Sequence, residues 1–149
     1  MRGYKIMESD MTCRGFQYKI GKKYTLKDKL KLCENGFHFC ENPFNCLYYY
    51  DNIKGDKRLF IIESLSKVIT NGNKSVTNKI KIIEEIKDIE KFFDENIDNF
   101  EVDWFYISGN QKLSEEFIDK YNDRVEWSCI SKYQKLSEDF IEKHKNKIS

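Results

Sequence analysis

The residues best suited to chemistry in this sequence lie together in the stretch Gly36–Tyr50. The stretch contains His38, Cys40 and Cys46 and ends in three consecutive tyrosines. Imidazole and thiol groups bind zinc or take part in nucleophilic catalysis, and tyrosine rings stack on flat ligands. We therefore expect any functional site of the chain to lie here.

Zinc binding is the first chemistry to consider. His38 and Cys40 are two residues apart on a predicted strand and so point to the same face, and Cys33 and Cys46 are near in sequence. The spacing lacks the paired C-x-x-C motifs of zinc knuckles, and cysteine is also a common buried residue. We predict no metal site.

A cysteine nucleophile activated by His38 is the second possibility, because a nearby imidazole can hold a thiol as its thiolate. His38 and Cys40, two residues apart on one strand, are poorly placed for proton transfer, and no Asn or Asp that would orient His38 is identifiable. Gly-rich phosphate loops and the H-E-x-x-H metal helix are also absent from the sequence.

Binding of a flat ligand, such as a base or a nicotinamide ring, is the third interpretation. Its candidate residues are the histidine and the three tyrosines, which are His38, Tyr48, Tyr49 and Tyr50. The alternative is that one or two of the tyrosines pack in the core while the others lie at the surface.

Local signals indicate the elements that position this stretch. Asn35-Gly36 is typical of a turn, Phe37–Cys40 of a short strand, and Asn42-Pro43 of the cap and first position of a helix. Asn71-Gly72-Asn73 is typical of a hairpin turn. Further strands are predicted at 3–7, 13–20, 58–65, 67–70 and about 78–83, a weak helix at 26–33 and another helix from about 84.

The last third of the sequence contains an internal repeat with a period of 23 residues. The segment that begins at Trp104 recurs at Trp127, and Gln111–Ile118 recurs as Gln134–Ile141. In each copy a serine is followed by two acidic residues, the arrangement preferred at a helix N-terminus. Each copy is thus predicted to form two short helices, one beginning at Trp and one at Ser.

A single copy cannot bury its apolar face alone, so the copies must stack. We predict an α+β domain at 1–85 and a helical array at 86–149, with a degenerate copy at 89–104 and full copies at 104–126 and 127–149. The array has more aromatic residues than such short units can bury, so some should contact a partner. The candidates for partner binding are Trp104, Phe105, Tyr106, Trp127 and Tyr133.

Composition excludes several classes of protein. The 149 residues include 26 Lys and Arg against 25 Asp and Glu, which gives a formal net charge of +1 and argues against dedicated nucleic-acid binding. No apolar run approaches the roughly 20 residues of a membrane helix. The five cysteines, an odd number without a secretion signal, are interpreted as reduced thiols. We expect a soluble cytoplasmic protein.

Motifs in the first 85 residues resemble an uncharacterised family of small bacterial and phage proteins. These motifs are G-Y-K at 3–5, M-T-C-R-G-F-Q-Y at 11–18, G-F-H-F-C at 36–40 with Pro43, Tyr49 and Tyr50, and N-K-S-V-T-N-K-I-K-I at 73–82. The family implies no established activity. The W-x-x-I-S and Q-K-L-S-E-x-F-I motifs of the array resemble short helical repeats of phage and large-virus proteins. Together these resemblances imply an accessory protein of a mobile element.

The strand Gly36–Cys40, with a tyrosine-bearing helix after it, is also similar to the middle motif of ADP-ribosyltransferases. In those enzymes the strand and a downstream tyrosine flank the nicotinamide ring of NAD. The resemblance implies His38, Tyr49 and Glu63 as catalytic residues. Such enzymes also need an Arg or His on the first strand, which holds the dinucleotide, and a late glutamate, which stabilises the ribosyl cation. The sequence offers Arg2, Tyr4 or Lys5 for the first role, and Glu63 or Glu101 for the second.

The sequence therefore predicts an α+β fold, a small mixed or antiparallel sheet domain with short helices followed by a helical repeat array. The first functional hypothesis is a phage or mobile-element protein that binds a host macromolecule through its repeats, as an inhibitor of a host defence complex in the manner of anti-CRISPR proteins. This hypothesis needs no cofactor. The second is an ADP-ribosyltransferase-like enzyme or a degenerate NAD-binding or nucleotide-binding protein.

Overall fold

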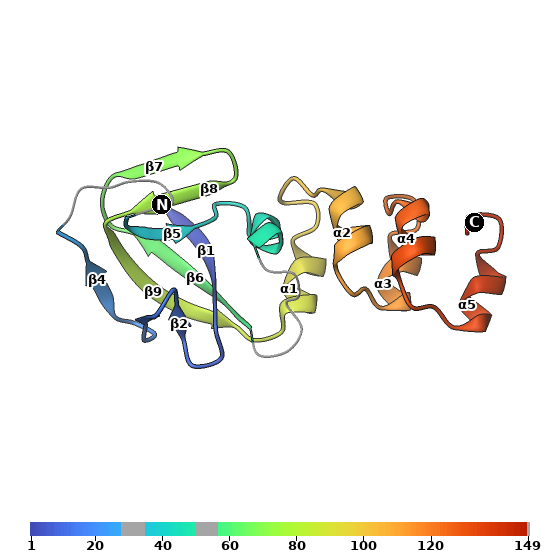
Figure 1. Ribbon diagram of the computed structural model, residues 1–149, viewed down its shortest axis with the longest axis horizontal. Helices are drawn as coiled ribbons and strands as arrows, with labels where there is room; N and C mark the ends of the chain where they lie inside the picture. Colours follow the sequence, from blue (N-terminus) through green and yellow to red (C-terminus); the bar gives the residue numbers. More distant parts are fainter. Residues whose placement is uncertain (28–34, 50–56, 149) are drawn as a thin grey trace. The chain divides into compact units, whose positions relative to one another are not determined.

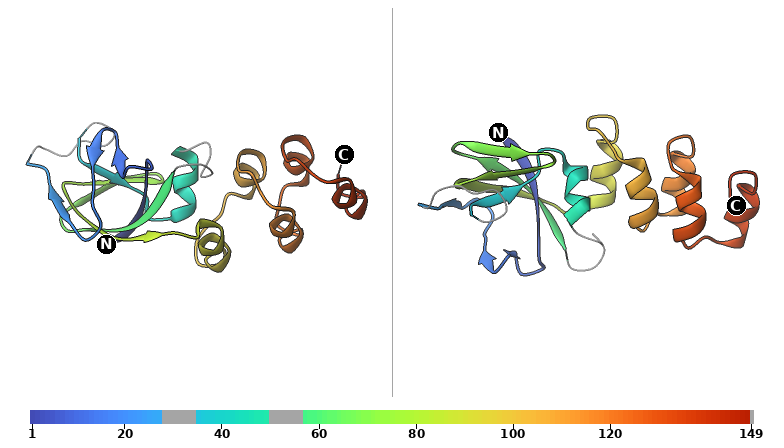
Figure 2. Two further views of the ribbon diagram at one scale, coloured as in Figure 1. Left: turned by 90° about the horizontal axis from the view of Figure 1, so that it is seen from below. Right: turned by 45° about the horizontal axis from the view of Figure 1, so that its top comes forward.

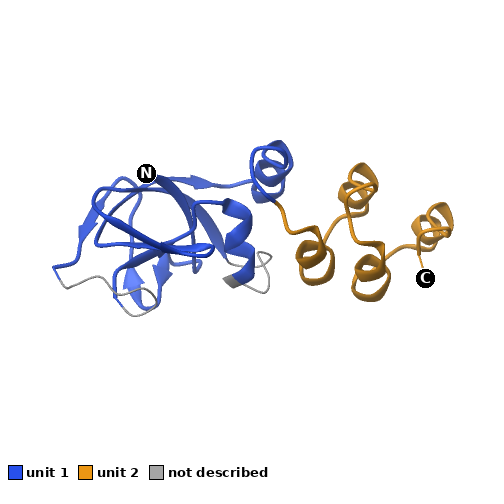
Figure 3. Cartoon of the chain, turned by 90° about the horizontal axis from the view of Figure 1, so that it is seen from above, with its two compact units in different colours: residues 1–101 blue, residues 102–149 orange. Residues whose placement is uncertain are grey.

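The computed structural model describes residues 1–27, 35–49 and 57–148, with the side chain of Tyr49 excluded. The chain forms two compact units, Met1–Glu101 and Val102–Ser149 (Figure 3). The first contains antiparallel sheets and short helices and the second is entirely helical, so the predicted α+β class is confirmed. The predicted weak helix at 26–33 lies largely outside the described residues.

The largest sheet of the first unit has four antiparallel strands in the order β1-β6-β9-β4 (Figure 1). Leu59 and Phe60 are adjacent in β6 and both are fully buried, so this internal strand is covered on both faces, as its apolar sequence predicts. The strand bounds are β1 Arg2–Met7, β4 Lys23–Thr25, β6 Arg58–Ser64 and β9 Lys79–Ile86.

A second antiparallel sheet has the order β5-β8-β7, with β5 at Phe37–Phe39, β7 at Val68–Asn71 and β8 at Lys74–Thr77. Gly72 has a φ of 63° at the first position of the two-residue β7–β8 loop, the conformation of a type II′ hairpin turn. The predicted hairpin is therefore confirmed. β5 also meets β1 through an isolated bridge between Tyr4 and Cys40.

The predicted strand at 13–20 is wrong. The chain instead forms a small hairpin of β2 (Thr12–Cys13) and β3 (Phe16–Gln17). Arg14 and Gly15 both have positive φ, 52° and 78°, as the central residues of a type I′ turn require. A left-handed turn at an arginine is rare, and it reverses the chain where the alternation of apolar residues suggested a straight strand.

The helix predicted from about 84 begins later, because β9 continues to Ile86. Arg58 and Glu85 form a two-point ion pair across β6 and β9, which extends the sheet pairing to this end. Helix α1 (Ile89–Glu95) follows with Asp88 as its N-cap.

Helix α1 belongs to the first unit, since Phe93 packs on Phe44 with ring centroids 4.7 Å apart, and Phe92 packs on Tyr4 at 5.7 Å. This aromatic packing places the end of the unit at Glu101, beyond the predicted boundary at residue 85.

The proline-initiated helix after β5 is a 3₁₀ helix, η1 (Pro43–Tyr49). Asn42 begins it as predicted, because its side-chain oxygen accepts a hydrogen bond from the N–H of Phe44 at 2.9 Å. The core beneath the sheets consists of buried apolar side chains from β1, β5, β6 and β9, joined by Tyr18. These residues are Met7, Tyr18, Phe37, Phe39, Phe60, Ile62, Ile80 and Ile82.

The second unit contains two copies of a helix pair, as the repeat predicts (Figure 2). The helices are α2 Trp104–Asn110, α3 Glu115–Lys120, α4 Trp127–Tyr133 and α5 Glu138–Lys143. Ser114 and Ser137 are the N-caps of α3 and α5, and each accepts a hydrogen bond from the N–H three residues later. None of the helices in the described part of the chain is long and apolar enough to cross a membrane.

The two copies contain equivalent clusters of three aromatic rings. In the first, Trp104 and Phe117 pack on Tyr121. In the second, Trp127 and Phe140 pack on residue 144, a histidine whose ring also contacts Asp119 of the first copy at 3.0 Å. Gln134 of the second copy also binds the main chain of the first copy. Its amide accepts a hydrogen bond from the N–H of Leu113 and donates to two main-chain carbonyls, those of Ser108 and Gln111.

Candidate functional site

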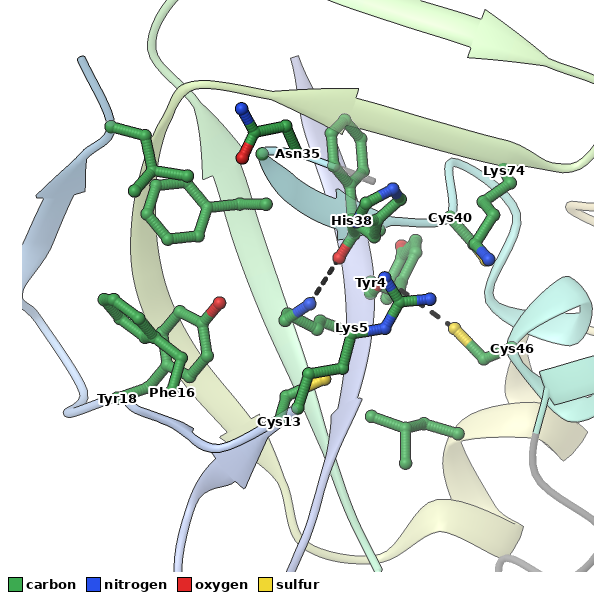
Figure 4. Close-up of a pocket in the computed structure, with 16 residues that line it drawn as sticks. Tyr4, Lys5, Cys13, Phe16, Tyr18, Asn35, His38, Cys40, Cys46 and Lys74 are labelled. Carbon is green, nitrogen blue, oxygen red and sulfur yellow. Dashed lines mark hydrogen bonds between the residues drawn. The ribbon is translucent and has the colours of Figure 1, made fainter. Parts of the chain in front are cut away.

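A cavity of about 400 Å³ opens in the first unit where the two sheets meet (Figure 4). Its wall is built by β1, the Arg14-Gly15 turn, β5, Cys46 of η1 and the first residue of β8, Lys74. The volume lies within the range of small-molecule sites, roughly 300 to 1,000 Å³. The stretch Gly36–Cys40, in which the sequence predicts a functional site, supplies the largest continuous part of the wall.

Lys5, one of the first-strand candidates, is a buried lysine in the cavity wall. It lies on β1, its residue is only 6% exposed, and its amine donates a hydrogen bond to the main-chain carbonyl of His38. Its amine also lies 5.6 Å from the centre of the Tyr18 ring. Burial lowers the pKa of this amine, because removal from water disfavours the charged form. The Cys13 thiol hydrogen-bonds the amine and, with Cys46, opposes this lowering of the pKa.

Positively charged side chains surround His38. Its pKa is lowered to about 4, first by burial and then by the cationic side chains of Arg14, Lys5 and Lys74. A main-chain hydrogen bond at Gly36 opposes this shift. His38 is thus a neutral imidazole at neutral pH, and the cavity that it lines carries cations from three separate elements.

Aromatic rings form the wall of the cavity on the Lys5 side (Figure 4). The ring of Phe16 lies 4.7 Å from that of Tyr18 and 5.4 Å from that of Phe37, centre to centre. Phe16 is 37% exposed, so its ring is open to solvent although it belongs to this cluster. Such a wall can take the face of a flat ring.

Three thiols that form no disulfide also line the cavity, those of Cys13, Cys40 and Cys46. Cys46 hydrogen-bonds Cys40, and this bond together with burial raises the pKa of the Cys46 thiol. The neutral Cys46 thiol is therefore a poor nucleophile and a poor metal ligand. The same hydrogen bond lowers the pKa of the Cys40 thiol. Within the described residues, no group of three or more His, Cys, Asp or Glu side chains is placed to hold a metal ion.

The predicted ligand residues separate in the structure. His38 lines the cavity, whereas Tyr48 is half-buried and is not part of its wall. Tyr50 and the side chain of Tyr49 lie outside the described residues. Of the first-strand candidates, Tyr4 and Lys5 line the cavity and Arg2 does not.

The candidate glutamates lie elsewhere. Glu63 is paired with Arg2 in the register of β6 and β1, and Glu101 ends the first unit. Neither belongs to the cavity wall, and none of the residues that line it in the described part of the chain carries a carboxylate.

Two charged residues of the cavity were not predicted from the sequence. Arg14 enters the wall through the left-handed turn, and Lys74 through the β7–β8 hairpin. The dipeptide Arg14-Gly15 is a turn signal within an alternating run, and it could have indicated the first of them. Lys74 is brought to His38 by strand pairing between β5 and β8, in which His38 is opposite Val76.

The predicted partner-binding residues differ in exposure. Trp104, Tyr106 and Trp127 are half-buried, and both tryptophans pack within their own clusters of three aromatic rings. Phe105 and Tyr133 are 65% and 59% exposed.

The fold and the cavity define an α+β domain with a cation-lined pocket, followed by a helical repeat unit. The chain belongs to the family described as a domain of unknown function, DUF7666, whose model matches residues 1–95. The match covers β1 to α1 and therefore every residue of the cavity. No curated protein and no solved structure matches the chain.

Proposed function

We propose that this chain is a non-catalytic binding protein whose first unit holds a small flat ligand in the cavity beside His38. The observation that carries the proposal is the composition of the wall: aromatic rings of Phe16 and Tyr18 on one side, His38 and cations around them, and no carboxylate among the described lining residues. Rings supply stacking surface, and the polar groups fix the orientation of the ligand.

The same composition argues against catalysis of ADP-ribosyl transfer. That reaction needs a glutamate to stabilise the ribosyl cation, and neither Glu63 nor Glu101 lines the cavity. The neighbourhood of His38 is positive, which would oppose a cationic transition state. The proposed role of the cavity is therefore to bind NAD or a related nucleotide without cleaving it.

A thermal-shift screen of the full chain tests the proposal. Nicotinamide, the common nucleosides and NAD are added separately, and the melting temperature is recorded. A ligand at 100 times its Kd stabilises the folded state by about 2.7 kcal/mol, so a ligand that binds here raises the melting temperature. A parallel incubation with labelled NAD and host lysate is expected to transfer no label. Absence of any thermal shift, or transfer of label to protein, would contradict the proposal.

The helical unit supports a second function, binding of a protein partner. Phe105 and Gly109 are four residues apart on α2 and so share a face, and the ring of Tyr133 lies against Gly109. The two exposed aromatic side chains thus lie on one side of the α2–α4 pair. The resemblance of the repeats to those of phage and large-virus proteins supports a host macromolecule, such as a defence complex, as the partner.

Comparison of matched variants tests this second function. The full chain, a Phe105→Ser/Tyr133→Ser variant and a Lys112→Ser/Lys135→Ser control are used as bait in lysate of the host. Loss of large aromatic anchors is expected to remove a protein that the wild type and the control both retain. A partner retained equally by all three chains would contradict binding through this face.

A further inference from the structure

We propose that the cavity recognises its ligand through a phosphate group held among Lys5, Arg14 and Lys74, so that the ligand class is a phosphate ester that also carries a flat ring. The inference rests on the flat-ligand site proposed above and adds the charged group by which that ligand is bound.

The wall of the cavity is positively charged. The side chains of Lys5, Arg14 and Lys74 all line the cavity, and no carboxylate does so among the described residues. All three also act on His38 as positive charges. Like charges gathered around a partly dehydrated space repel one another, and an anion placed among them removes that cost.

Lys5 is buried in the wall of the cavity. A buried ammonium group is costly unless it is paired with a negative charge. The amine of Lys5 instead donates to the His38 carbonyl and lies near the Tyr18 ring. The Cys13 thiol also hydrogen-bonds the amine, and Cys13 and Cys46 oppose the lowering of its pKa. No carboxylate among the described lining residues supplies a full counter-charge. A bound anion would supply it.

Phosphate and carboxylate differ in charge and in number of acceptor oxygens, and the cations of the wall fit phosphate better. A phosphate monoester carries nearly two negative charges at neutral pH and three acceptor oxygens, whereas a carboxylate carries one charge. Arginine binds such oxygens in a forked geometry, and lysine acts as a point charge beside them. One arginine and two lysines can therefore offset the nearly two negative charges of a phosphate, and each of them can donate to one of its three oxygens.

The rest of the ligand would lie beside the aromatic side chains of the wall. Lys5 and Lys74 lie on different sides of His38, and Phe16 and Tyr18 lie on the side of Lys5 (Figure 4). A phosphate among the cations thus leaves an attached ring next to the aromatic wall. The volume of about 400 Å³ is enough for a mononucleotide-sized molecule.

Calorimetric titration with four nucleosides and their four 5′-monophosphates is the direct test, because each pair shares a ring and differs by the phosphate. At least one monophosphate is expected to bind tenfold or more tightly than its nucleoside. Arg14→Gln and Lys74→Gln should each reduce this ratio, while Lys67→Gln, a change of an exposed lysine outside the wall, should leave it unchanged. A nucleoside that binds as tightly as its monophosphate would overturn the phosphate inference and retain the flat-ligand proposal. Absence of binding by all eight compounds would overturn both.

An NMR titration of His38 tests the anion independently of the ring. The charged groups around this imidazole are Arg14, Lys5 and Lys74. Sulfate keeps two negative charges over the pH range in which His38 titrates. Sulfate is expected to raise the pKa of His38 relative to chloride at equal ionic strength, and to raise it less in the Arg14→Gln variant. Equal pKa values in the two salts would overturn the phosphate inference, whatever the outcome for flat ligands.

Discussion

The amine of Lys5 donates a hydrogen bond to the main-chain carbonyl of His38, 2.5 Å away, and so ties β1 to β5 in the wall of the cavity. The same strands are joined next to it by two hydrogen bonds between the main chains of Tyr4 and Cys40. Lys5 thus places one positive charge of the cavity wall at the point where β1 of the first sheet pairs with the β5 segment of the second. A change at either residue should alter stability and binding together.

Replacement of His38 by Gln should change how stability depends on pH. The pKa of His38 is about 4 in the folded chain and about 6.5 when unfolded, so between these values the unfolded state binds more protons. This residue therefore lowers the stability of the wild type as the pH falls from 6.5 to 4. Urea unfolding at several pH values should give a smaller loss for His38→Gln over this range. Parallel curves for the two chains would contradict a depressed pKa.

Gly3 is closely packed, and an alanine there should destabilise the first unit. A β carbon at residue 3 would lie 2.3 Å from Cδ2 of Phe39, which is buried in the core, and 3.1 Å from the Cys40 carbonyl. Overpacking of this kind costs about 1 to 3 kcal/mol of unfolding free energy. Denaturant unfolding measures it.

Gly109→Ala is the matched control, because a β carbon there would lie 3.6 Å from Tyr133, an ordinary contact. Alanine within a helix is favoured over glycine by about 0.5 to 1 kcal/mol, so this variant should be as stable as the wild type or more so. The packing described around β1 would be refuted by a Gly3→Ala variant that is no less stable than Gly109→Ala.

The two equivalent glutamines of the repeats should differ in their contribution to stability. Gln134 makes three hydrogen bonds to the main chain of the first copy, at 2.6 to 3.1 Å. Its counterpart Gln111 has a buried side-chain nitrogen with no hydrogen-bond partner among the described residues. Gln134→Ala should therefore cost about 1 to 3 kcal/mol. Gln111→Ala should cost less, and equal losses in thermal unfolding would contradict this interpretation of the stack.

Much of the fold could be predicted from local patterns. The apolar run of β6, the Asn71-Gly72 turn and the Ser caps of α3 and α5 each follow from local rules of backbone geometry and burial, and the structure has all of them. The period of the repeat likewise predicted two helices in each copy. These features depend on residues close together in the chain.

The site was only partly predictable, because it is assembled from residues distant in sequence. His38 was identified from its own motif, but its cationic neighbours arrive from β1, from the turn at Arg14 and from β8. The continuous alternation from Cys13 to Ile20 concealed that turn, since both of its central residues have positive φ. The tyrosines were favoured by composition alone, and Tyr48 is not in the wall.

Replacement of Lys5 by Met is the measurement that tests the central claim most directly. Methionine has a similar length and is apolar, so it removes the cost of burying a charge that no carboxylate among the described lining residues offsets. If Lys5 is kept for a bound phosphate ester, Lys5→Met should unfold at an equal or higher urea concentration without ligand and should lose at least tenfold in affinity for the monophosphate that binds the wild type. Lys67→Met, an exposed control, should change neither quantity. A Lys5→Met chain that is less stable than the wild type and binds the monophosphate with unchanged affinity would contradict the account.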